Sequence, residues 1–257
     1  MNRPVVFVTD YGRDDTYAAA LTGAALAADP DSRCIDGTHG VPPGDILAGA
    51  YHLKALRFAF DRCVLCAVVD PGVGTSRRAI AIQLGSDIIC TAPDNGLISY
   101  LWEETVPMLR RVVSIDVPGD ISATFHGRDV FAPAAARLAG GASLTSLGDP
   151  IDDPVILDTA FATADALGLH GRVAVVDHFG NAITTIREED LGATTLTGAS
   201  WGGGSTAHVV ATYDEIPDGE LAVLVGSAGH VEIAARGAAA ASLNGPAVGD
   251  AVTVTFG

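Results

Sequence analysis

The chain has 257 residues, of which 31 are acidic and 15 basic, so its formal charge at pH 7 is −16. A charge of this sign repels nucleic acid and anionic membranes, so we expect neither as a partner. Hydrophobic residues make up 48% of the chain, which is enough for a sizeable core in one large domain or two smaller ones.

Short apolar runs alternate with alanine- and leucine-rich segments through the first part of the chain. The runs at 5–10, 63–70, 79–84, 87–92 and 112–117 resemble strands, and the segments at 15–28 and 45–60 resemble helices. Because this alternation is typical of strands joined by helices, we expect an N-terminal α/β domain at residues 1–160. Its sheet should be mostly parallel and flanked by helices.

The pattern changes after Leu167. Runs rich in β-branched residues at 172–177, 182–186, 207–213, 221–226 and 251–256 are separated by Gly, Asp and Asn. This predicts a small antiparallel β domain at residues 168–257. The segment 147–169, which holds two prolines and several acids, is predicted to be a connector.

Neither a targeting signal nor a membrane span is expected. No basic start with an apolar run precedes the first strand, and no apolar stretch reaches the ~18 residues of a membrane helix. We therefore expect a cytoplasmic protein. The four cysteines are expected to be buried thiols, because Cys63 and Cys66 in "CVLC" should point to opposite faces of a strand and no second Cys/His pair follows at ligand spacing.

Polar residues end several of the apolar runs. Asp10, Asp70, Asp94 with Asn95, and Asp177 with Asn181 all lie at such positions. In α/β sheets, ligands bind at the carboxyl ends of strands, so these residues are candidates for a binding site. The alternative is structural, since Asp and Asn also cap helices and form turns.

Two arginines follow Asp70 in the stretch "DPGVGTSRR". The turn contains Pro71 and two glycines but lacks the phosphate-loop pattern. At the start of a strand, Arg77 and Arg78 should point to opposite faces, so that one turns back towards Asp70 while the other meets solvent. A purely structural ion pair is the alternative explanation.

A second polar cluster lies in "TFHGRD". Here His126, Arg128 and Asp129 precede an alanine-rich segment that we expect to form a helix beginning near Pro133. Asp129 and Arg128 can cap and pair at the start of that helix. That role does not explain His126, which is therefore a candidate for chemistry.

Seven motifs in order resemble the S-adenosyl-L-methionine (SAM) hydroxide adenosyltransferase family, which is related to the fluorinase and chlorinase. They are "VTDYG", "VVDPGVGTSRR", "APDNGLISY", "TFHGRD", "DHFGN", "YDEIPDGEL" and "GSAGHVEIA". The resemblance implies an α/β N-terminal domain, a smaller C-terminal antiparallel β-barrel domain, and homotrimers whose sites lie between subunits.

The resemblance also implies roles for individual residues. Asp70, Arg77 and His126 match the family's catalytic triad, and Asp10 matches the residue that holds the ribose hydroxyls. The stretch "RGAAA" at 236–240 departs from the family by lacking a serine. The other implied substrate contacts are Asp177 and Asn181 at the methionine half, Phe125 and Tyr213 beside the nucleoside, and Ser227, Glu232 and the backbone near Ala235 at the other end of the ligand.

The implied reaction is attack of water on C5′ of SAM, giving adenosine and L-methionine without a metal or other cofactor. Water must be made hydroxide-like by neighbouring charges, and the sequence leaves open which triad residue takes its proton. A halogenase is disfavoured because Asp70 and His126 are both present and the link from Arg78 to Asp94 is short. A non-catalytic nucleoside-binding module and a metal-dependent hydrolase are the remaining alternatives; the chain has no H-E-x-x-H motif.

Overall fold

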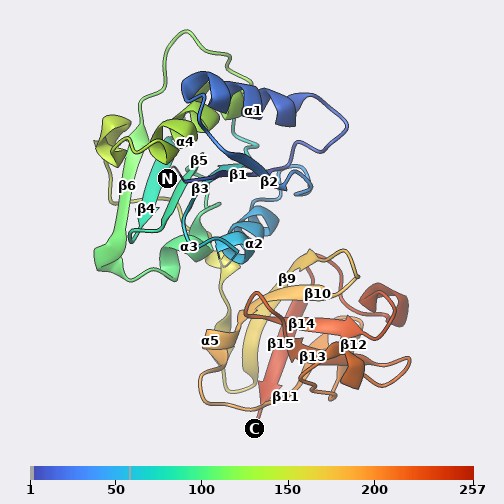
Figure 1. Ribbon diagram of the computed structural model, residues 1–257. Coiled ribbons are helices and arrows are strands. Elements are labelled where there is room, and N and C mark those ends of the chain that lie inside the picture. The colour runs from blue at the N-terminus through green and yellow to red at the C-terminus, as the bar shows by residue number, and fades with distance from the viewer. Residues whose placement is uncertain (1–2, 58) are drawn as a thin grey trace. The chain divides into compact units, whose positions relative to one another are not determined.

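The computed structural model of the chain describes residues 3–57 and 59–257. The chain divides after Leu157 into two units, each with its own sheet and its own hydrophobic core (Figure 1). The first unit is α/β and the second is an antiparallel, nearly closed barrel, so the predicted fold class is confirmed. Within the described residues, no helix is long and apolar enough to span a bilayer.

The N-terminal unit is built on a seven-stranded sheet in the order β2-β1-β3-β5-β4-β6-β7. The ladder directions make β1, β2, β3, β5 and β6 run one way, whereas β4 and β7 run the other way. The carboxyl ends of the five strands that run the same way therefore share one edge of the sheet, and their amino ends share the opposite edge. The strands are β1 Val5–Thr9, β2 Cys34–Thr38, β3 Cys63–Val68, β4 Ala79–Leu84, β5 Ile88–Pro93, β6 Arg110–Ile115 and β7 Gly148–Pro150.

Helices cover both faces of this sheet (Figure 1). α1 (Tyr17–Ala28) and α4 (Ala132–Ala139) lie on one face, and α2 (Ile46–Arg57) and α3 (Ser99–Glu103) lie on the other. The central strands are consequently buried on both faces, which explains why their sequences are continuous apolar runs. Short helical turns complete the unit: η1 Pro107–Leu109, the π-helical η2 Gly127–Phe131, and η3 Leu144–Ser146.

The predicted strands of this unit lie close to the observed ones, but two strands were not predicted. β2 has the sequence "CIDGT" and is partly exposed at the edge of the sheet, so it carries no apolar run. β7 lies in the segment expected to be a connector. The helix predicted at 45–60 ends at Arg57, and Phe58 lies outside the described residues.

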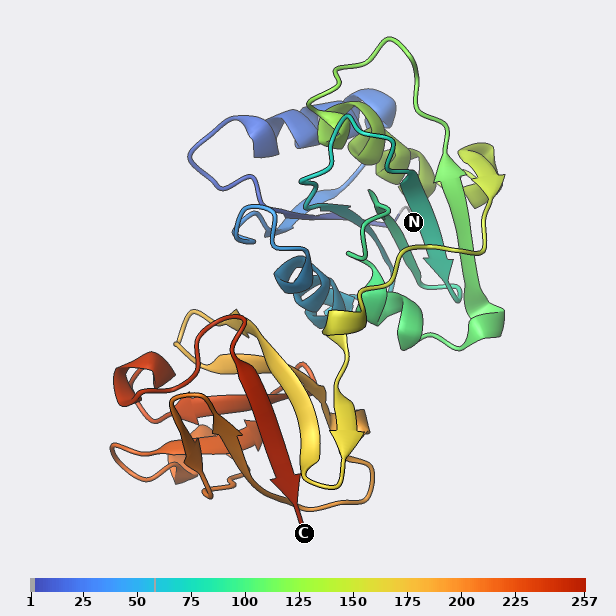
Figure 2. The same cartoon turned by 180° about the vertical axis from the view of Figure 1, so that it is seen from behind.

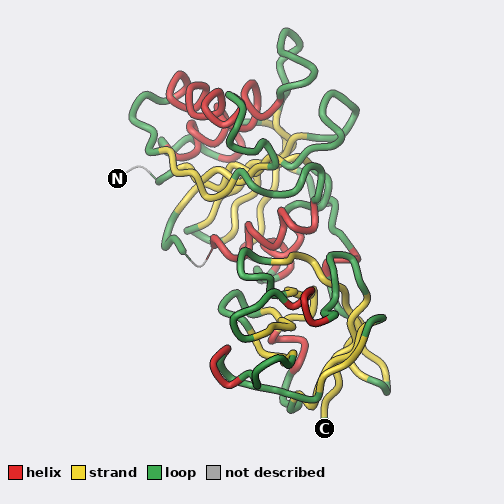
Figure 3. The backbone as a smooth tube through the Cα atoms, turned by 90° about the vertical axis from the view of Figure 1, so that its right-hand side faces the viewer, coloured by secondary structure: helices red, strands yellow, loops and turns green. Residues whose placement is uncertain are grey.

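The C-terminal unit is an antiparallel sheet in the order β12-β11-β15-β9-β10-β14-β13, with β8 paired to β9. Figures 2 and 3 show that this unit consists mostly of strands and loops. The chain after β12 approaches β13, where Thr206 Oγ1 donates to the Leu221 carbonyl at 2.5 Å and Val209 bridges Val223. The elements are η4 Asp158–Ala160, β8 Thr163–Asp165, β9 Gly168–Val176, β10 Ala182–Arg187, α5 Glu188–Leu191, β11 Leu196–Trp201, β12 Gly204–Thr206, η5 Tyr213–Glu215, β13 Leu221–Val225, β14 His230–Ala235, η6 Ala240–Leu243 and β15 Ala251–Phe256.

One predicted strand of this unit is wrong. The run 207–213 forms no strand; among the described residues its only β-pairing is the single bridge from Val209 to Val223, and the turn η5 begins at Tyr213. Because this run is mostly exposed, its β-branched residues do not pack as a strand would require. The predicted connector is also partly structured, since it contains β7, η4 and β8.

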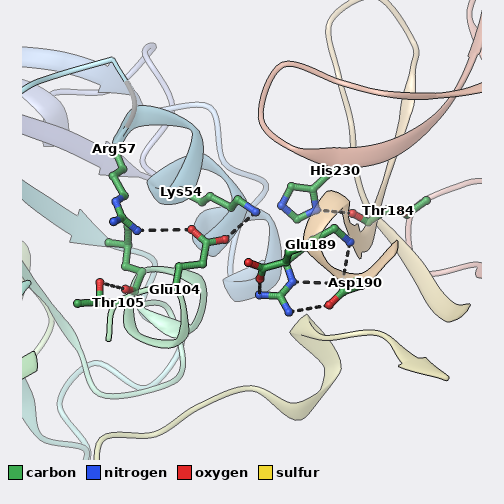
Figure 4. Close-up of polar contacts among 10 residues, drawn as sticks. Lys54, Arg57, Glu104, Thr105, Thr184, Glu189, Asp190 and His230 are labelled. Atoms are coloured by element: carbon green, nitrogen blue, oxygen red, sulfur yellow. Dashed lines mark hydrogen bonds and ion pairs between the residues drawn. The ribbon is translucent and has the colours of Figure 1, made fainter. Parts of the chain in front are cut away.

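Each unit also contains a cluster of ion-paired side chains (Figure 4). In the N-terminal unit, buried Lys54 of α2 lies 2.7 Å from Glu104, and Arg57 lies 3.5 Å from the same carboxylate. In the C-terminal unit, Arg187 pairs with Glu189 and Asp190 at the start of α5. These contacts join neighbouring elements within each unit: α2 to the end of α3, and β10 to α5.

Candidate functional site

The loop after β3 brings Arg77 back onto Asp70. The Nε of Arg77 donates to Oδ1 of Asp70 at 3.0 Å, and its Nη2 donates to Oδ2, so the pair is bidentate. Gly74 in this loop has φ +77° and lies against the carbonyl of Ala123, where a side chain would clash. The turn therefore requires glycine, and it places two oppositely charged groups at the carboxyl edge of the sheet.

Arg77 also reaches His126, the residue just before the π-helical turn η2. Nη2 of Arg77 donates to Nδ1 of His126 at 2.9 Å. A guanidinium has no lone pair, so Nδ1 must be the acceptor, and the neutral ring carries its proton on Nε2. Burial and the charge of Arg77 both lower the pKa of His126, which favours this neutral form.

The three side chains are held in a protected setting. The side chains of Arg77 and Asp70 are only 10% and 5% exposed, and the Arg77 guanidinium lies 5.3 Å from the centre of the Phe131 ring. The remaining contact of Arg77 runs from Nη1 to the Arg78 carbonyl at 3.4 Å. One Nη1 hydrogen is thereby left without a partner among the described residues. The structure thus brings all three predicted triad residues together, with a free donor beside them.

Asp10 directly follows β1 at the same edge of the sheet. Its Oδ2 accepts a hydrogen bond from the backbone N–H of Gly44 at 2.8 Å. Burial raises the pKa of Asp10, and the nearby charge of Asp70 adds to the rise. Asp10 is thus a half-buried carboxylate with Oδ1 uncommitted among the described residues, as a hydroxyl-binding residue requires.

Hydrogen bonds through buried His39 support the strand end that precedes Asp10. Nδ1 of His39 lies 2.8 Å from Oγ1 of Thr9, and Nε2 lies 3.2 Å from Oδ1 of Asp36. The His39 carbonyl also accepts the Gly12 N–H at 2.8 Å. Sequence reasoning missed His39, because its partners lie on β1 and at the edge strand β2, and only the tertiary fold brings them together.

Three aromatic rings meet beside this edge. Phe125 lies 5.8 Å from Tyr11 and 5.3 Å from Tyr17 in edge-to-face arrangements, and Arg128 stacks over Phe125 at 5.0 Å. Phe125 was predicted as a nucleoside contact, whereas Tyr11 and Tyr17 were not considered. The "TDYG" motif around Tyr11 was a signal that could have found the first of them.

Arg78 does not simply meet solvent, as the sequence led us to expect. Its Nε donates to Oδ2 of Asp94 at 2.7 Å, and its Nη1 and Nη2 donate to Oδ1 and the carbonyl of Asp153 at 2.7 Å each. Asp94 in turn accepts the N–H of Val155 at 2.8 Å. The two arginines contact different acids, as predicted, although both precede β4 and do not lie in a strand. Arg78 links the end of β5 to the 153–155 segment.

In the C-terminal unit, Asp177 and Asn181 form one tight turn between β9 and β10. Oδ1 of Asp177 accepts the N–H groups of Phe179 and Asn181, and Oδ2 accepts the Asn181 side-chain amide at 2.9 Å. These contacts fit the structural alternative for Asp at a turn. Phe179 is 76% exposed at the tip of the turn.

Tyr213 and Glu232 form a second polar pair in this unit. The Tyr213 hydroxyl donates to Oε2 of Glu232 at 2.8 Å. Glu232 is 4% exposed, and burial raises its pKa, with the charge of Asp177 acting in the same direction. Ser227 lies exposed in the β13–β14 turn, whereas Ala235 lies at the far end of β14. The structure therefore groups Tyr213 with Glu232 and places Ser227 and Ala235 at opposite ends of one hairpin.

The cysteines are free thiols in the interior. Cys63, Cys66 and Cys90 are buried, and Cys34 is partly buried. Burial raises the pKa of Cys63 to about 11 and that of Cys66 to about 12, so both remain protonated at neutral pH. Among the described residues, no group of three or more His, Cys, Asp or Glu side chains is placed to hold a metal ion.

Comparison with known families gives two matches along the chain. Residues 5–148 match the SAM hydroxide adenosyltransferase N-terminal domain, and residues 171–253 match the C-terminal domain of the same family. Together the two ranges cover the triad, Asp10 and the polar pairs of the second unit.

Individual proteins are similar over most of the chain. Proteins named (R)-S-adenosyl-L-methionine hydrolase from Salinispora tropica and Thermus thermophilus are 39% and 38% identical, covering 98% and 94% of this chain and 98% and 95% of their own lengths. A fluorinase from Actinopolyspora mzabensis is 29% identical over 74% of each chain. The solved structure of an uncharacterized conserved protein from Thermotoga maritima superposes with a TM-score of 0.86, 30% identity and coverage of 97% of this chain and 99% of that one.

Proposed function

The chain belongs to the SAM hydroxide adenosyltransferase family, and from that premise we propose that it hydrolyses SAM to adenosine and L-methionine. The observation that carries the proposal is Arg77, which binds Asp70 through two hydrogen bonds and His126 through a third. Water is a poor nucleophile, and such a cluster of fixed charges and donors is a means of activating it without a metal.

In the proposed mechanism, a water molecule is held between the Arg77 and His126 donors and aligned with the C5′–S bond. Its oxygen attacks C5′ as the bond to sulfur breaks, and the bonding pair returns to sulfur to give neutral methionine. One water proton stays on the new 5′-hydroxyl and the other leaves. Alignment of this kind is worth up to ~7–11 kcal/mol in well-oriented intramolecular reactions.

We assign the departing proton to Asp70. Nδ1 of His126 is occupied by the Arg77 donor, and Nε2 already carries a hydrogen, so the neutral ring acts as a donor. The Asp70 oxygens each accept one bond from Arg77 and retain lone pairs. His126 and Arg77 therefore stabilise the incipient hydroxide, while Asp70 orients Arg77 and takes the proton.

Substrate contacts are proposed from the same geometry and the family resemblance. Asp10 binds the ribose hydroxyls through its uncommitted oxygen, and Phe125 lies beside the nucleoside. The second unit contributes Asp177, Asn181, Tyr213, Ser227, Glu232 and the backbone near Ala235. We further propose a homotrimer in which these groups complete the site of a neighbouring copy; a chain ending at Leu167 should then be monomeric and inactive, which native mass spectrometry and a turnover assay test.

No metal or other cofactor enters this proposal, and EDTA should leave turnover unchanged. We also propose a cytoplasmic location, which the free cysteines support because disulfides are rare in that compartment. A fluorinase-like reaction is the main rival within the superfamily. The Asp70 carboxylate disfavours a halide beside C5′, because two anions at close range repel.

The decisive experiment is hydrolysis in ¹⁸O-water with chloride present. We expect the label in the 5′-hydroxyl of adenosine, unlabelled methionine and no chlorinated nucleoside. Label in homoserine together with methylthioadenosine would place attack on the methionine chain, and 5′-chloronucleoside would establish halogenation. Absence of any turnover by the full-length protein would favour the nucleoside-binding alternative.

A further inference from the structure

Arginines gather at the edge of the N-terminal sheet opposite to the triad. Arg3 and Arg62 precede β1 and β3, and Arg111 is the second residue of β6; these three strands begin at the same edge. Arg33, just before β2, is at this edge as well. The chain has only 15 basic residues against 31 acidic ones, so this group of arginines is locally positive in a chain whose net charge is negative.

Three of these arginines line one surface cavity of about 580 Å³. Arg3, Arg62 and Arg111 share it with Gln83 and the 140–145 turn that follows α4, which includes the exposed hydroxyls of Ser143 and Thr145. No lining residue carries a carboxylate. Its volume is in the range of small-molecule sites, which are typically about 300–1,000 Å³.

Of the three guanidinium groups, only that of Arg3 makes hydrogen bonds to the described residues. Arg3 donates to the carbonyls of Asp87 and Ser86 at 2.6 and 2.5 Å, so it is anchored to the β4–β5 turn without a carboxylate bond. Arg62 is largely exposed, and its nearest carboxylate oxygen, on Asp87, is 3.9 Å away. Burial and the positive charge of Arg62 lower the pKa of Arg3, while the nearby charge of Asp87 acts in the opposite direction.

Arg111 has no side-chain hydrogen bond or ion pair to any residue that the structure describes. Its β6 position is paired with Gln83 of β4, another lining residue. One more acid lies close by: the Asp29 carboxylate is against Gly140, and its Oδ2 accepts no hydrogen bond from the described residues. Even so, the three arginines that line this cavity make only one ion pair with the described carboxylates, the 3.9 Å contact between Arg62 and Asp87.

We propose that this cavity binds a small polyanion carrying two or more phosphate groups. Guanidiniums bind phosphate through paired N–H donors, and three of them on separate strands suit several phosphates better than one. A nucleic acid is disfavoured by the charge of −16. SAM is not the ligand, because it carries a sulfonium cation and its proposed contacts lie at the carboxyl edge of the sheet.

Isothermal titration calorimetry with inorganic triphosphate tests the proposal on the full-length protein. We expect saturable binding to the wild type, and a loss of about tenfold in affinity for each of Arg62→Gln and Arg111→Gln. Arg33→Gln is the matched control, because it removes the same charge from the same edge without lining the cavity. The affinity of this variant for triphosphate should stay within about twofold of wild type.

Three outcomes would overturn the proposal: no saturable binding to the wild type, an equal loss in Arg33→Gln, or citrate binding more tightly than triphosphate. Without saturable binding there is no site. An equal loss in Arg33→Gln would mean that triphosphate is attracted only by the general positive charge of this edge. Tighter binding of citrate would mean that the cavity prefers carboxylate groups to phosphate groups. Thermal unfolding of each variant without ligand checks that the fold is retained. Arg3 is left unchanged because it anchors the β4–β5 turn.

Discussion

Arg77→Lys separates the charge of the triad from its geometry. The lysine keeps one positive charge near Asp70, which avoids leaving a carboxylate that is 5% exposed without a cation. It loses the two-pronged contact with Asp70 and the simultaneous bond to His126, because an ammonium group is a point charge on a flexible stem. If the Arg77 donors act on the incipient hydroxide, turnover should fall by about 10²–10³, or ~2.7–4 kcal/mol, the range for losing one oriented transition-state donor.

The assay is single-turnover hydrolysis of SAM, with adenosine followed by chromatography and binding followed separately by calorimetry. The matched control is Arg78→Lys, which makes the same exchange at the neighbouring position. Because the Arg78 side chain contacts Asp94 and Asp153, and only its backbone carbonyl contacts Arg77, its variant should lower the urea midpoint of unfolding while keeping turnover within about threefold of wild type.

A double variant adds a second check. His126→Asn alone should resemble Arg77→Lys, and the two losses combined should be far from additive, because residues that act as one unit fail together. Equal losses of turnover in Arg77→Lys and Arg78→Lys would refute the triad argument. So would fully additive losses in the double variant, since they would mean that Arg77 and His126 act independently.

Three further predictions follow from the same contacts. Asp10→Asn should weaken SAM binding by about 1.5–3 kcal/mol with a smaller effect on saturated turnover, and unchanged affinity by calorimetry would make Asp10 a turn residue only. The pKa of His126 in the folded state is below its ordinary 6.5, so the unfolded chain takes up the proton first as the pH falls. The free energy of unfolding should therefore decrease as the pH drops from 6.5 towards the lowered pKa. Urea midpoints across this range should show a slope that His126→Gln reduces, and an identical slope in the variant would contradict the assignment. Lys54→Met should destabilise the N-terminal unit by less than the ~3–5 kcal/mol of an uncompensated buried charge, because Arg57 still contacts Glu104. Lys54→Met with Glu104→Leu should recover much of the loss in chemical denaturation.

The sequence predicted best where one local rule controls the outcome. The central strands carry continuous apolar runs because helices bury both of their faces, so their positions could be read directly. Arg77 and Arg78 contact different acids, as predicted, but both precede β4, so strand alternation is not the cause. Edge strand β2 was not predicted and the prediction for the run 207–213 was wrong, because exposure, rather than local preference, decides whether such residues pair.

Contacts between distant segments were beyond local rules. The hydrogen bonds of His39 to Thr9 and Asp36 need β1 and β2 to be adjacent. The contact of Arg78 with Asp153 needs the 153–155 segment to return to β5. No spacing in the sequence encodes either approach. The family resemblance supplied Asp70, Arg77 and His126 as a set, whereas the hydrogen-bond direction that makes His126 a neutral donor came only from the structure.

The pairing of acids at the carboxyl edge has a consequence for the proposed reaction. SAM enters as a sulfonium cation, and its positive charge disappears as the C5′–S bond breaks. A site with unpaired carboxylates would stabilise the cation more than the transition state and would slow the step. Arg77 offsets part of the charge of Asp70, and Arg78 offsets part of the charge of Asp94. The same arginine that orients the water thus also reduces an electrostatic penalty on the loss of the sulfonium charge.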